Sequence, residues 1–81
     1  MYAAVVNVRP NEDFSLFVEF DDGSKGVLDM KPYLDFGVFR RLKSLDEFKR
    51  ARVVFDTVEW DCGVDLDPEF VHSKLRPKKT A

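Results

Sequence analysis

The residues best suited to chemistry lie in one short stretch, W-D-C-G-V-D-L-D-P-E-F, which runs from residue 60 to residue 70. With Glu59 before it and His72 soon after it, this segment combines five acidic side chains with the only Trp, the only Cys and the only His of the chain. Such groups can hold a metal ion or activate a nucleophile. A structural interpretation, in which a strand turns into a helix here, has to be weighed against both.

The spacing of these residues does not predict a metal site. Structural zinc needs four Cys or His ligands at short spacings, whereas Cys62 and His72 lie ten residues apart without companions. A calcium loop that began at Asp65 would need Gly at its sixth position and Glu at its twelfth, where this chain has Phe70 and Arg76. We therefore expect no metal and no cofactor.

The same stretch does not predict an enzyme. Cys62 and His72 form the only possible pair of thiol and base, and no third residue that would orient the base can be identified. The D-L-D-P segment superficially resembles the paired Asp motif of phosphoryl-transferring hydrolases, but that chemistry needs a much larger parallel sheet. The structural interpretation accounts for most of the residues, because Trp60 anchors a strand, Gly63 makes a turn and Asp67 caps a helix.

The elements that position this stretch predict an α+β fold with a small antiparallel sheet. Period-two alternation and turn residues predict a three-stranded meander, followed by a helical insert, a second hairpin and a short C-terminal helix. The second hairpin is expected to turn around Asp56-Thr57. The predicted elements are strands over residues 3–8, 14–20 and 25–30, the insert over 37–48, the hairpin over 51–61 and a helix that begins after Asp67.

Three local signals add detail to this prediction. Asp22-Gly23 is typical of a tight two-residue turn of the primed type. Ser44 and Glu47 fit the S-x-x-E capping box at the start of a helical turn. Helical spacing places Val38 on the apolar side of the insert, facing the core.

Length and composition set the limits of the molecule. Eighty-one residues fit a single domain, which we expect over residues 1–73, with a flexible basic tail over residues 74–81. A single Cys excludes an internal disulfide and is typical of a cytoplasmic protein. No apolar run approaches the ~18 residues of a membrane span, so we expect no membrane contact.

Charge is strongly zoned along the chain, and this predicts binding surfaces. We expect a protein partner on an acidic face of Glu59, Asp61, Asp65, Asp67 and Glu69. The alternative is nucleic-acid binding by a basic cluster of Arg40, Arg41, Lys43, Lys49, Arg50 and Arg52. It is less favoured, because the net charge is −2 and no nucleic-acid-binding motif is present. A homodimer through a sheet edge, and a ligand pocket among Phe17, Tyr33 and Phe36, stay open.

Three motifs together resemble a known family. They are F-x-D-G-S-x-G-x-x-D-M from Phe20, F-x-x-L from Phe39 with Phe48 after it, and the W-D-C-G-V-D-L-D-P-E-F stretch. From Val5 to Val71 the chain resembles small bacterial proteins that contain domain of unknown function 2442, although Asp61 stands where Pro is usual in that family.

The resemblance implies an α+β fold and no known enzymatic activity. It also implies genes that occur in pairs of the toxin–antitoxin type. We therefore expect a non-enzymatic interaction module, the antitoxin-like member of such a pair.

Overall fold

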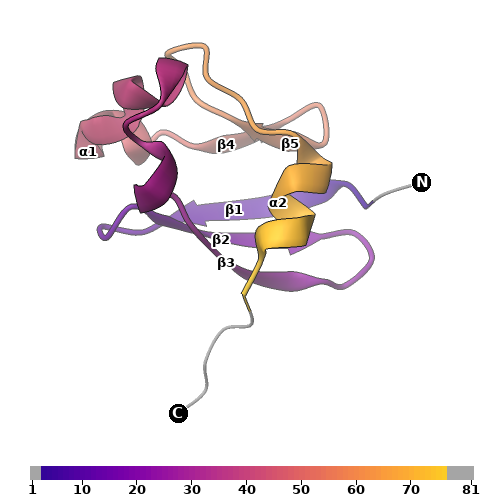
Figure 1. The fold of residues 1–81 in the computed structure, drawn as a ribbon. Coiled ribbons are helices and arrows are strands. Elements are labelled where there is room, and N and C mark those ends of the chain that lie inside the picture. Colours follow the sequence, from indigo (N-terminus) through magenta and orange to yellow (C-terminus); the bar gives the residue numbers. More distant parts are fainter. Residues whose placement is uncertain (1–2, 77–81) are drawn as a thin grey trace.

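The computed structural model describes residues 3–76, and it confirms the expected α+β fold (Figure 1). A three-stranded antiparallel sheet in the order β1-β2-β3 is followed by helical segments, a separate β4–β5 hairpin and a C-terminal helix. The elements are β1 (Val5–Pro10), β2 (Ser15–Phe20), β3 (Lys25–Asp29), the 3-10 helices η1 (Lys31–Tyr33) and η2 (Gly37–Lys43), α1 (Leu45–Phe48), β4 (Arg52–Val54), β5 (Thr57–Glu59) and α2 (Pro68–Lys74).

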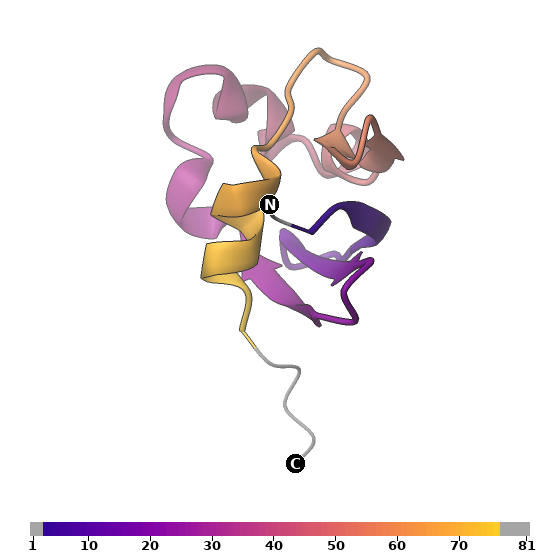
Figure 2. The ribbon, with the colours of Figure 1, turned by 90° about the vertical axis from the view of Figure 1, so that its right-hand side faces the viewer.

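The central strand β2 has the alternation that its sequence predicts. Leu16, Val18 and Phe20 are buried on one face of the sheet, while Phe17 and Glu19 lie on the opposite face with part of their surface exposed. Buried residues of the helical segments and of the second hairpin join these three in one core cluster, so those elements cover this face of the sheet. Figure 2 shows them next to the sheet. The opposite side, which we call the open face, is not covered by any of these elements.

The turn between β2 and β3 differs from the expected two-residue primed turn. Phe20 N–H donates to the Ser24 carbonyl over 2.8 Å, so the loop has three residues rather than two. Of these only Gly23 has positive φ, at 88°. This is the three-residue loop with a bulge at Gly, in which Asp22 needs no left-handed backbone. Its carboxylate instead accepts a bond from Ser24 N–H at 2.8 Å.

The helical insert is formed mainly by 3-10 turns, and two local predictions in it are wrong. A 3-10 helix has three residues per turn, so Phe39 and Leu42 share one side and Val38 turns away, 53% exposed. Ser44 is the N-cap of α1, but its side chain makes no capping bond. Glu47 Oε2 is buried and, among the described residues, has no hydrogen-bond partner, so the capping box does not form.

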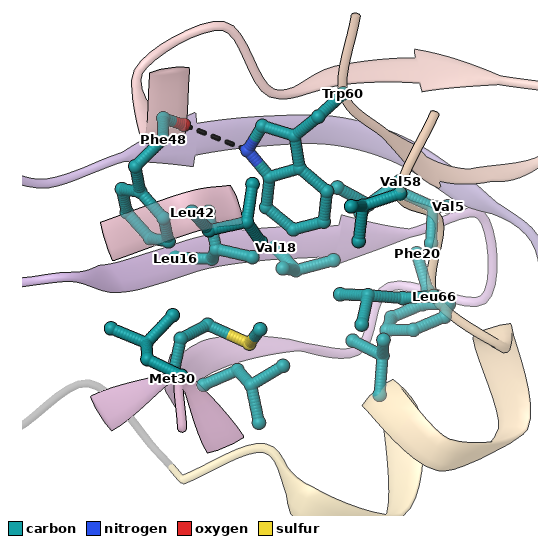
Figure 3. Packing of buried hydrophobic residues seen from close by; sticks show 14 residues of the cluster. Val5, Leu16, Val18, Phe20, Met30, Leu42, Phe48, Val58, Trp60 and Leu66 are labelled. Atoms are coloured by element: carbon teal, nitrogen blue, oxygen red, sulfur yellow. Dashed lines mark hydrogen bonds between the residues drawn. The ribbon is translucent and has the colours of Figure 1, made fainter. Parts of the chain in front are cut away.

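The core is one cluster of buried apolar residues between the sheet and the segments that cover it (Figure 3). Trp60 is fully buried, and its indole N–H donates to the Phe48 carbonyl over 2.8 Å. This bond ties the end of the second hairpin to α1, and the two aromatic rings lie 6.0 Å apart. The stretch that seemed suited to chemistry therefore supplies the anchor of the core.

Both edges of the three-stranded sheet have neighbours. The β4–β5 hairpin lies alongside β1, and Val5 N–H donates to the Asp56 carbonyl over 2.9 Å. At the other edge, Arg76 exchanges two backbone hydrogen bonds with Val27 of β3, three residues beyond the expected domain boundary at residue 73. A Cβ at Gly26 would collide with the Arg76 carbonyl, so this close approach requires Gly.

Residues 77–81 of the expected tail lie outside the described residues. Within residues 3–76, no helix has the length and apolar character needed to cross a membrane.

Candidate functional site

Most of the residues that looked chemical have structural roles. Asp67 caps α2 by accepting a bond from Glu69 N–H at 2.9 Å, and Pro68 occupies the first helical position. Gly63 has φ of 90°, as the turn after Trp60 requires. Cys62 is half-buried, and its carbonyl accepts a bond of 2.9 Å from the Arg41 guanidinium.

His72 does not belong with Cys62, because it faces the β2–β3 turn. Its Nε2 lies 3.3 Å from Ser24 Oγ and 3.5 Å from Asp22 Oδ2, and its ring packs edge-on against Phe20 at 4.9 Å. A Ser, a His and an Asp in contact suggest a triad, but here both neighbours contact the same ring nitrogen. A triad needs the acid on the other nitrogen to orient the base. The contacts therefore hold α2 against the hairpin.

Sequence reasoning missed this group, because 48 residues separate Ser24 from His72 and no pattern links them. The Ser24 backbone N–H, assisted by the Ser24 hydroxyl, holds the pKa of Asp22 below its ordinary value. Among residues 3–76 there is no group of three or more His, Cys, Asp or Glu side chains that could hold a metal ion.

The acidic face and the basic cluster meet on the second hairpin. Arg52 contacts Asp61 directly, and its Nη2 lies 3.7 Å from Glu59 Oε1. Arg50 Nη1 is 3.9 Å from Asp61 Oδ2. Asp65 is paired through its backbone with Glu59 on the neighbouring strand. The structure thus brings Glu59, Asp61 and Asp65 together, but two arginines partly neutralise them.

The remaining basic side chains also have partners within the chain. Lys43 Nζ lies 2.6 Å from Asp35 Oδ1, and this hydrogen bond lowers the pKa of Asp35. Arg40 donates to the Asp35 carbonyl at 3.3 Å, and Lys49 is 3.6 Å from Glu12. With Arg41 on the Cys62 carbonyl, all six residues of the basic cluster are engaged. Fewer of their charges are left for the phosphates of a nucleic acid than the sequence indicates.

The most exposed apolar surface lies at the turn between β4 and β5. The turn is formed by Phe55 and Asp56, not by Asp56-Thr57, and both residues have positive φ, at 48° and 68°. Phe55 is 94% exposed, while Val6 and Val53 are 56% and 37% exposed. The bond from Val5 to Asp56 brings Val6 to the same end of the molecule as Phe55. We call Val6, Val53 and Phe55 the tip cluster.

Sequence reasoning did not find the tip cluster. Primed two-residue turns usually contain Asn, Asp or Gly, because both residues must adopt positive φ. Phe55 carries no such signal, and an isolated Phe in a β-rich segment reads as a core residue.

Comparison with known proteins identifies a family. Residues 5–72, most of the chain, match a family model described as protein of unknown function (DUF2442). The match covers nearly the same residues as the resemblance between Val5 and Val71, and confirms it. No curated protein and no solved structure matches the chain.

Proposed function

This chain belongs to the DUF2442 family of proteins of unknown function, and from this premise we propose that it is a protein-interaction module without enzymatic activity. The proposal is supported by the tip cluster. The group formed by Ser24, Asp22 and His72 lacks the arrangement of a nucleophile and an oriented base, and the carboxylates near Trp60 serve as caps and ion pairs.

The observation that carries the proposal is Phe55. Burial of a Phe side chain contributes about 1.5–3 kcal/mol, yet this one is 94% exposed. Its left-handed backbone costs about 1–2 kcal/mol for an ordinary L residue. A strained position that buries nothing does not stabilise the isolated chain. Burial of the Phe55 ring in a partner protein would account for both the exposed ring and the strained backbone.

The surroundings of Phe55 have the composition of a binding surface. Val6 and Val53 are further exposed apolar residues at this end of the molecule, Val53 two residues before Phe55 and Val6 next to the Val5–Asp56 bond. Arg52 and Glu59 pair at the other end of the same hairpin, and Arg52 also contacts Asp61 just beyond it. An aromatic anchor with a polar rim is the usual arrangement of an interaction hot spot.

We further propose that the partner is a second small protein encoded beside this one, with this chain as the antitoxin-like member. The support is the paired-gene arrangement that the family resemblance implies. The acidic face is proposed to attract a basic partner, because Asp65 and Glu69 of that face have no ion pair with another described residue.

A pull-down from native lysate with tagged protein tests whether the chain is a protein-interaction module. The wild type is expected to retain one protein at stoichiometric level, and Phe55→Asn is expected to retain at least about tenfold less, as for a hot spot. Asn is chosen because it tolerates positive φ, so the turn is preserved. Charge reversal at Glu59 and Asp61 is a less direct test, because it also breaks the contacts with Arg50 and Arg52.

Phe36→Ser is the matched control, because Phe36 is 66% exposed but lies outside the tip cluster. It is expected to retain the partner fully. Equal loss in both variants would show that the tip cluster is not the contact. Absence of any stoichiometric protein with the wild type would count against the interaction module itself.

A further inference from the structure

The end of α2 is attached to the β2–β3 hairpin at two places. Nε2 of His72 lies 3.5 Å from Asp22 Oδ2 and 3.3 Å from Ser24 Oγ, in the turn of the hairpin. Further along the chain, Arg76 exchanges backbone hydrogen bonds of 2.8 and 2.9 Å with Val27 on β3. Because the segment between His72 and Arg76 is short, the contact at the turn helps to hold the backbone that covers the edge of β3.

The start of α2 is anchored differently, by apolar contacts. Val71 is fully buried, and the ring of Phe70 packs edge-on against that of Tyr33, with 5.3 Å between the ring centres. These contacts do not depend on a group that titrates near neutral pH. The charge of His72 therefore acts on the end of the helix and on the residues that follow it, rather than on the attachment of the helix to the core.

Among the charged groups of the hairpin, Asp22 is the one that faces His72. A backbone hydrogen bond within the turn is the largest cause of the lowered pKa of Asp22, and the charge of His72 lowers it further. Asp22 is therefore ionised throughout the range in which histidines titrate. Asp21 accepts a bond of 3.1 Å from a backbone N–H just before β1. Lys25 lies on the open face, because it is paired with Glu19.

On α2 itself, the surroundings also favour a positive charge at His72. Glu69 lies three residues before it, on the same side of the helix. His72 belongs to the last turn, where the helix dipole stabilises cations. Lys74 is two residues away and points to another side, and the Phe20 ring, which His72 meets edge-on at 4.9 Å, carries no charge. Protonated His72 therefore has more favourable contacts than neutral His72.

We propose that His72 is a pH-dependent latch, which in its protonated form holds residues 72–76 against the edge of β3. An imidazolium forms an ion pair with Asp22, whereas a neutral imidazole keeps only the hydrogen bond with Ser24. Histidines of unfolded chains titrate near pH 6.5, so the ion pair stabilises the contact fully below that pH and is lost as the pH rises above it. Loss of the ion pair makes opening of the bridge between Val27 and Arg76 more frequent.

The latch regulates access to one edge of the sheet. In the closed bridge, the N–H and the carbonyl of Val27 are both bonded to Arg76. In the open bridge, both groups are free to pair with another chain, because an unpaired strand edge is a template for association. The edge of β3 is therefore better covered in mildly acid than in mildly alkaline conditions.

Amide hydrogen exchange of the full chain, followed by NMR between about pH 5.5 and pH 8, tests the latch across the range in which histidines titrate. Protection factors remove the intrinsic pH dependence of exchange. The protection of the Val27 and Arg76 amides is expected to fall by about two- to fivefold across this range, which is what one exposed ion pair allows. The amide of Leu28, which is paired with Leu16 inside the sheet, is expected to be better protected at every pH, because the bridge opens without unfolding of the sheet.

Two variants and a matched control identify the groups that form the latch. His72→Gln can bond with Ser24 but carries no charge, and Asp22→Asn keeps the acceptor for the Ser24 N–H without the negative charge. In acid, both are expected to show the low protection that the wild type has in alkaline conditions. Asp46→Asn, the same substitution at an exposed acid of α1, is expected to behave as the wild type.

Four outcomes would overturn the proposal. They are wild-type protection that does not change with pH, a pH dependence that persists in His72→Gln or Asp22→Asn, loss of the pH dependence in Asp46→Asn, and equal protection of the Leu28 and Arg76 amides in the wild type.

Discussion

Three residues other than Gly have positive φ in the described part of the chain: Phe14, Phe55 and Asp56. Phe14 and Phe55 are the same amino acid in the same backbone region, but only Phe14 packs on a neighbour, with its ring 5.2 Å from that of Phe48. The structure thus compensates the strain at Phe14 by packing. At Phe55 no packing contact with another residue between 3 and 76 compensates the strain.

This contrast gives a stability prediction. Phe55→Asn is expected to raise the free energy of unfolding by about 1 kcal/mol, because Asn adopts the left-handed region more readily than Phe. Phe14→Asn relieves the same backbone strain but removes the contact with Phe48, so it is expected to lower the free energy of unfolding by about 1–3 kcal/mol. Urea denaturation of both variants measures the difference. A loss of stability in Phe55→Asn would mean that the ring already has an intramolecular partner.

The two α-helices begin with different kinds of cap. Asp67 makes its capping bond to the Glu69 backbone at the start of α2, whereas the Ser44 side chain makes none at the start of α1. Asp67→Ala is expected to lower the free energy of unfolding by about 1 kcal/mol, and Ser44→Ala by less than about 0.5 kcal/mol. Denaturation of the two alanine variants under identical conditions checks this. A Ser44→Ala variant that loses as much as Asp67→Ala would show that the capping box forms in solution.

At the same scale, the sequence predicts the strands better than the helical insert. Strand β2 is recognisable because alternate residues must reach opposite faces, and Leu16, Val18 and Phe20 follow that rule. The insert has the right apolar residues, but spacing alone does not distinguish 3-10 turns from α-helix. Because the turns are 3-10 rather than α-helical, Val38 is exposed to solvent instead of facing the core.

The candidate site was less predictable, because it depends on pairing between separate segments. The sequence shows acids near residue 60 and arginines near residue 50 as two zones, and only the hairpin register makes them one group of ion pairs. The exposure of Phe55 depends on a turn that its residue type does not favour.

On the scale of the whole molecule, much of the charge that is zoned along the chain is compensated in space. Lys49 lies beside Glu12, Lys43 beside Asp35 and Arg52 beside Asp61. Each exposed pair contributes only about 0–1 kcal/mol, so their main effect is on the surface potential. Several acids without an ion pair to a described residue lie on α1 (Asp46, Glu47), at the second hairpin (Asp56) and on the bridge beside it (Asp65).

Stability is expected to fall in acid through three carboxylates. The pKa of Asp13 is held down by the Ser15 hydroxyl, that of Asp22 by the Ser24 backbone N–H and that of Asp35 by Lys43. A carboxylate whose pKa is lower in the folded chain than in the unfolded chain stabilises the fold at every pH above its unfolded pKa. This stabilisation is lost as the pH falls through the pKa of the folded state. The melting temperature is therefore expected to decrease below about pH 4, the region where unfolded Asp titrates.

Melting curves of the triple variant Asp13→Asn, Asp22→Asn, Asp35→Asn, recorded between neutral and acid pH, test this assignment. The variant is expected to melt lower than the wild type at neutral pH and to change less on acidification. Parallel profiles for the two proteins would assign the acid sensitivity to other groups.

The bridge between Val27 and Arg76 bears on how the protein is made. Strand β3 is complete once residue 29 has been synthesised, but the backbone that covers its outer edge arrives only when the ribosome has released Arg76. During that interval a growing chain presents an unpaired strand edge, the feature through which nascent proteins associate wrongly. Gly26, which leaves room for the late-arriving backbone, is thus a condition for closing this edge at all.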